Sequence, residues 1–182
     1  AGCSVSGYLE QFARNFFTNL SVDERRQILA VAERFPTSAL SILAKLPQDV
    51  SPEVLKIVRE LDAKLVGQTD DRFARVRVGA AAVLARSNQP ETIEYLHQVY
   101  QNEPDQRPTV AMALTQHPAG KNWPVLIDAL DTLEGPAAEE VIVALQKVRV
   151  RPEEPTPYRN VILQGLRATG AGGEAANKLL AY

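Results

Sequence analysis

The sequence predicts an all-α protein of about ten helices that stack in antiparallel pairs. Apolar side chains recur every three or four residues through most of the 182 residues, which is the spacing of one helix face. Pro and Gly interrupt these stretches at short intervals, as expected for brief connections between helices. A pattern covering two helices also repeats with an offset of 30 residues. Repetition at such a period in helical sequence indicates stacked helix pairs.

The composition agrees with helix packing and excludes several classes of function. Apolar residues make up 45% of the chain and aromatic residues only 6%, with Ala and Leu prominent, which suits helices better than a β-sandwich. The 20 basic and 22 acidic residues give a net charge of −2. This balance offers no electrostatic basis for binding nucleic acid. No apolar run approaches the ~18 residues that a membrane span needs.

A single cysteine, Cys3, excludes an internal disulfide. The segment Ala1-Gly2-Cys3 resembles the end of a bacterial lipoprotein signal, which would place the protein in a periplasmic or lipid-anchored context. The alternative is an arbitrary chain boundary beside an ordinary free cysteine.

The first two helices are expected before Pro36. Apolar residues at helical spacing predict a helix over residues 7–19. Ser21 and Glu24 then form a capping box, in which each side chain can bond to the other residue's backbone amide. This signal predicts a second helix that ends at Pro36.

The next two helices are expected between residues 37 and 67. Thr37 is predicted to cap a short helix carrying Leu40, Leu43 and Leu46. Ser51-Pro52-Glu53 combines a capping residue, a first-turn proline and a first-turn acid, and Gly67 provides a stop signal. The stripe between these signals is Val54, Ile57, Val58, Leu61 and Leu65.

A further helix is predicted from Asp70 to the break at residues 87–90. Gly79 lies in its middle, where Gly costs roughly 1 kcal/mol relative to Ala, and therefore indicates a close crossing with another helix. The side chains expected to face inward are Phe73, Val76, Ala80, Val83 and Leu84. The helix after the break should bury Ile93, Leu96, Val99 and Tyr100.

Three helices are predicted between residues 104 and 148. Pro104 opens the first, and Pro108 must then lie in its first turn, where no intrahelical bond is lost. Asn122 is predicted to cap the second, and Gly135-Pro136 separates it from the third. The predicted core residues are Val110, Leu114, Leu126, Ala129, Leu130, Leu133, Ala137, Val141, Ala144, Leu145 and Val148, with either Met112 or Ala113.

Residues 151–157 contain three prolines and predict an extended loop. Two helices should follow, separated by the glycines of residues 170–173. Because the sequence ends while still apolar and helical, we expect this chain to be part of a longer protein. The alternative is a last helix that docks and ends there.

The repeated pattern is an Arg, a small residue and a Leu, followed by a second apolar helix. Its first two copies are Arg77, Ala81, Leu84 and Leu96, then Arg107, Ala111, Leu114 and Leu126. A third copy has Val141 and Leu145, but Ala137 stands at the Arg position. The pattern resembles the HEAT repeats and the related bilin-lyase-type HEAT-like repeats. Residues 122–182 also look like HEAT segments of large modular bacterial proteins.

The resemblance implies a right-handed α–α superhelix. In such repeats the Arg packs across a repeat boundary, the Ala lies at a helix crossing and the Leu fills the core. The whole chain, residues 1–182, would be one solenoid domain. Its clearest repeats lie within 70–148, and less regular helical caps cover 1–69 and 149–182.

The sequence offers no convincing catalytic or metal-binding motif. Glu94 and His97 form a single Glu-x-x-His, whereas a di-iron bundle needs two such motifs and two further Glu residues. His97 and His117 fit no zinc spacing, and Cys3 is remote from both. We therefore expect no metal, no cofactor and no catalysis. The most basic local group contains Arg72, Arg75, Arg77 and Arg86, with acids nearby.

The favoured hypothesis is a non-catalytic scaffold that binds a protein, a peptide or a neighbouring domain. Solenoids commonly use the second helix of each pair, here residues 51–66, 91–101 and 122–133. The candidate contact residues are Tyr95, His97, Gln98, Trp123 and Asp128. For Trp123, the alternative is a side chain that closes the edge of the core. The competing hypotheses are a HEAT-like enzyme acting on nucleic acid, as DNA glycosylases do, or on a bilin, and a structural spacer.

Overall fold

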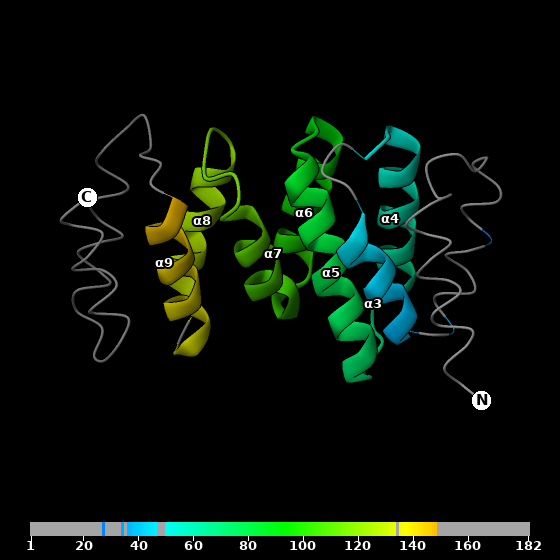
Figure 1. The fold of residues 1–182 in the computed structure, drawn as a ribbon. Coiled ribbons are helices and arrows are strands. Elements are labelled where there is room, and N and C mark those ends of the chain that lie inside the picture. The colour runs from blue at the N-terminus through cyan, green and yellow to red at the C-terminus, as the bar shows by residue number, and fades with distance from the viewer. Residues whose placement is uncertain (1–26, 28–33, 35, 47–49, 134, 149–182) are drawn as a thin grey trace. The chain divides into compact units, whose positions relative to one another are not determined.

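The computed structural model describes residues 27, 34, 36–46, 50–133 and 135–148 (Figure 1). These residues contain seven α-helices, one short 3-10 helix and no strand, which confirms the all-α class. The elements predicted over residues 7–35 and 151–182 lie almost entirely outside the described part of the chain.

The chain divides into two compact units, Ala1–Thr92 and Ile93–Tyr182. The boundary falls within helix α6, Pro90–Asn102, whose first turn belongs to unit 1 and whose remainder belongs to unit 2. Each unit is described separately.

Unit 1 contains α3 (Pro36–Lys45), α4 (Pro52–Lys64) and α5 (Asp71–Ser87), and α5 packs against both of the others (Figure 1). The prediction that Thr37 caps α3 is wrong, because the helix begins one residue earlier. Proline suits a first helical turn, since its φ is already near the helical value and its missing amide loses no bond. The buried apolar residues are Ala39, Ile42, Leu43, Leu46, Val54, Leu55, Ile57, Val58, Leu61, Leu65, Val76, Ala80, Ala81, Val83, Leu84 and Ala85.

The ends of α4 and α5 follow the signals in the sequence. Ser51 Oγ accepts a hydrogen bond from the Val54 amide at 3.5 Å, and the chain turns after α4 at Gly67, where φ is +78°. Asp70 Oδ1 accepts from the Arg72 amide at 2.8 Å and so caps α5. These side chains satisfy amides that have no partner within the first helical turn.

Gly79 marks the close crossing that the sequence predicts. A Cβ atom at this position would lie 3.0 Å from Leu40 Cδ1 and 3.4 Å from Leu43 Cδ1, both in α3. The missing side chain therefore lets α3 approach α5 closely. Phe73, which was predicted to face inward, is only half-buried in the first turn of α5.

Unit 2 contains the rest of α6, the 3-10 helix η2 (Pro104–Gln106), α7 (Arg107–Leu114), α8 (Asn122–Thr132) and α9 (Pro136–Val148). Helix α7 packs against α8 and α9, which also contact each other. Pro108 lies in the first turn of α7, as predicted. The buried apolar residues are Ile93, Leu96, Val99, Tyr100, Val110, Ala111, Ala113, Leu114, Trp123, Leu126, Ala129, Val141 and Ile142.

Asn122 is the first residue of α8 and does not cap it, so that prediction is wrong. Its side chain is buried and bonds elsewhere, because Nδ2 donates to the backbone oxygen of His117 at 2.9 Å. The preceding turn is made by Gly120, with φ of +50°, whose oxygen accepts from the Trp123 amide.

Candidate interaction surface on helices α6 and α8

Two side-chain hydrogen bonds join α6 to α8 within unit 2. The Tyr100 hydroxyl donates to Asp128 Oδ2 at 2.7 Å, and His97 Nε2 lies 2.8 Å from Asn122 Oδ1. His97 and Tyr100 are three residues apart, so both lie on the side of α6 that meets α8. The two helices are thereby joined at two points, and the exposed or half-buried side chains near these bonds offer a candidate interaction surface.

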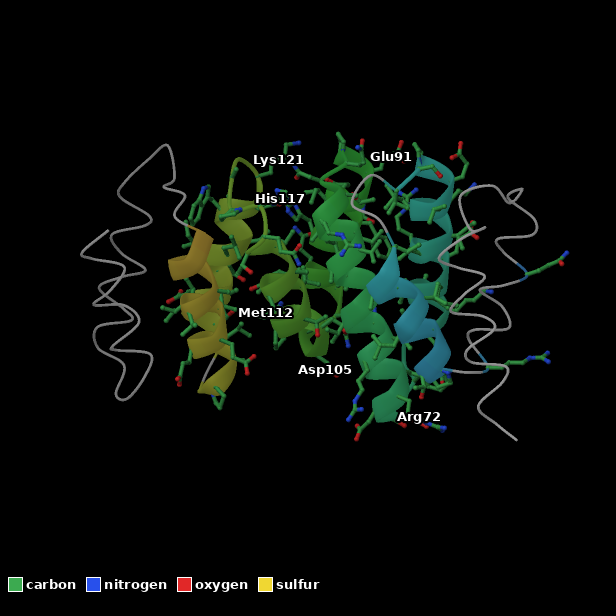
Figure 2. All side chains as sticks on the ribbon, in the orientation of Figure 1. Arg72, Glu91, Asp105, Met112, His117 and Lys121 are labelled. Carbon is green, nitrogen blue, oxygen red and sulfur yellow. The ribbon has the colours of Figure 1, made fainter. Side chains whose placement is uncertain are left out.

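We call this surface the α6–α8 face. It comprises the exposed or half-buried side chains on or beside α6 and α8 that lie close in sequence to the bonded residues, namely Glu94, His97, Gln98, Gln101, Lys121, Val125 and Asp128. Lys121 lies at the beginning of α8, on the same side of unit 2 as His117, whereas Asp105 of η2 lies at the other end (Figure 2).

The bonds around Asn122 determine which nitrogen of His97 carries a proton. Asn122 Nδ2 donates to the His117 carbonyl, so Asn122 Oδ1 is the atom that faces the imidazole. An amide oxygen can only accept, and His97 Nε2 is therefore the protonated nitrogen. In the neutral ring, Nδ1 is left as an acceptor, and no other described residue donates to it.

Tyr100 is held from both sides. Arg107 donates from Nε to the Tyr100 backbone oxygen at 3.2 Å, and its guanidinium lies 5.5 Å from the ring centroid. Burial, followed by the hydrogen bond to Asp128, raises the pKa of Tyr100 from 10.0 to about 12. The hydroxyl therefore remains a neutral donor near pH 7, which suits a structural contact and not proton transfer.

His97 and Asp128, two of the five predicted contact residues, each take part in one of the two bonds between α6 and α8, with Asn122 and Tyr100 respectively. Gln98, one residue after His97 in the sequence, is exposed, and its Nε2 donates to Glu94 Oε1 at 3.4 Å. Tyr95 is half-buried.

Trp123 is only 8% exposed, which agrees with a side chain that closes the edge of the core and not with an exposed anchor. It lies three residues before Leu126 on the inward side of α8, and its ring is part of the unit 2 core. From the sequence, Tyr100 was expected in the core of its helix pair and Asn122 at a helix cap, and neither pattern predicts the bond that each side chain makes between α6 and α8. A polar group at a core position of a helix is the signal that indicates such contacts, because a buried polar group needs a partner.

The arginines predicted to form a basic group are largely engaged in contacts within unit 1. Arg77 is buried and donates to Asp62 through Nε and Nη2, at 3.0 and 3.1 Å. Arg72 pairs with Asp70 at 2.6 Å, and Arg86 Nη2 donates to the Leu46 backbone oxygen at 3.0 Å. Arg72 is therefore paired at the start of α5, whereas Arg77 bonds to a residue of α4 and Arg86 to the residue that follows α3.

Comparison with known proteins supplies no relative. No family model matches the chain, and no curated protein or solved structure is significantly similar to it. Among the described residues, no group of three or more His, Cys, Asp and Glu side chains is arranged to hold a metal ion. In the same part of the chain, none of the helices combines the length and apolarity required to cross a bilayer.

Proposed function

We propose that this protein is a non-catalytic interaction or scaffold module. Its helices would continue as a HEAT-like right-handed superhelix of about ten helices, and the second helices of successive pairs would line the binding surface. The partner is a protein, a peptide or a neighbouring domain of the same chain. The observation that carries this proposal is the pair of hydrogen bonds that join α6 to α8, which the repeat pattern predicts to be second helices.

These bonds favour binding because they already hold the two helices together in the free protein. A surface whose helices are already held together loses less conformational freedom on association, so more of the contact energy appears as affinity. Binding groups on helices are also positioned more accurately than groups on loops. The α6–α8 face has both properties, and it combines exposed polar side chains with the half-buried Val125.

The nucleic-acid alternative receives no support from the arginines of unit 1. The charge of Arg77 is matched by Asp62 in the interior, and that of Arg72 by Asp70 at the start of α5. A phosphate-binding surface needs basic groups that displace counterions, which these pairs do not provide. The spacer alternative differs from the binding proposal in predicting no partner at the α6–α8 face.

A crosslinked pull-down from the native lysate tests the proposal with two matched variants. Gln98→Arg adds a long charged side chain at an exposed position of the α6–α8 face. Gln68→Arg makes the same change at an exposed position in the turn after α4. The proposal predicts a protein that the wild type and Gln68→Arg both retain and that Gln98→Arg loses.

Equal retention by both variants would refute binding at the α6–α8 face. Nucleic acid that is recovered only in low salt would support the glycosylase-type alternative, because phosphate contacts weaken steeply with salt. Circular dichroism of each variant confirms that the helices are intact before the comparison is made.

A further inference from the structure

We draw no further inference here: the strongest candidate, the apolar surface patch that the exposed side chains of Ala74 and Val78 form one turn apart on α5, carries none because nothing in the structure shows what covers it.

Discussion

Replacing Arg77 with Met should destabilise unit 1 severely. The Arg77 and Asp62 side chains are each 6% exposed, and they join α5 to α4 through two hydrogen bonds of 3.0 and 3.1 Å. Met keeps most of the apolar volume but leaves the Asp62 carboxylate buried without the charge and hydrogen bonds of Arg77. Removing one partner of such a pair typically costs about 3–5 kcal/mol of folding free energy.

Native-state hydrogen exchange is the appropriate assay, because a chain of two compact units need not unfold in a single step. A loss of about 3–5 kcal/mol corresponds to amide exchange in α4 and α5 that is faster by roughly two to four orders of magnitude. Arg72→Met provides the matched control. Its pair with Asp70 is 65% and 37% exposed, so the same substitution should change exchange in these helices far less.

A double variant separates the buried charge from the lost packing. Asp62→Leu combined with Arg77→Met removes both charges, and it should recover most of the protection that Arg77→Met loses. The reasoning would be refuted if Arg77→Met changed exchange in α4 and α5 no more than Arg72→Met, or if the double variant were less protected than either single variant.

Three further predictions concern pH and packing. The Arg72 side chain, followed by its backbone amide, lowers the pKa of Asp70 from 3.8 to about 2. The stabilisation by this cap should therefore persist from neutral pH to about 4 and be lost as pH falls through 2. NMR of the Asp70 carboxyl group can record this titration, and a titration midpoint near pH 4 would contradict the prediction. The pKa of Tyr100 is raised from 10.0 to about 12, so its stabilisation should be present below pH 10 and lost as pH rises through 12. Absorbance titration should show one tyrosine ionising late, and Asp128→Asn should move it toward but not below 10, because burial is the largest cause of the shift. Finally, Gly79→Ala should leave the free energy of unfolding in urea nearly unchanged, since its gain of roughly 1 kcal/mol in helix propensity offsets a tight contact with α3. Gly79→Leu should force α3 away from α5 and make the backbone amides of α3 exchange faster with solvent. Equal stability of the two variants would refute the close crossing.

The local features of the fold could be predicted because they depend on neighbouring residues. The cap at Ser51 and the close crossing at Gly79 follow from the conformational preferences of single residues and from helical spacing. The prediction for Asn122 was wrong because it used the same local preferences. Asn favours helix starts, but here its side chain forms a tertiary contact with His97 instead of capping α8.

Contacts between helices required the structure. Asp62 and Arg77 both lie at inward positions of their helices, and opposite charges at two such positions are a usable signal of a buried pair. The spacing of residues cannot say that these two side chains meet, because their contact depends on how α4 and α5 pack. The bonds of the α6–α8 face could not be predicted for the same reason. His97 and Asp128 could be proposed as surface residues from helical spacing, but the contact between Tyr100 and Asp128 depends on how the helices pack.

The most direct test of the central claim is hydrogen exchange of the wild-type protein with and without the partner recovered by pull-down. We predict slower exchange in α6 and α8, and no change in α3, when the partner is bound. The same partner added to Gln98→Arg should produce no such slowing. Protection confined to unit 1, or protection of α6 and α8 that persists in Gln98→Arg, would contradict the assignment of the α6–α8 face as the binding surface.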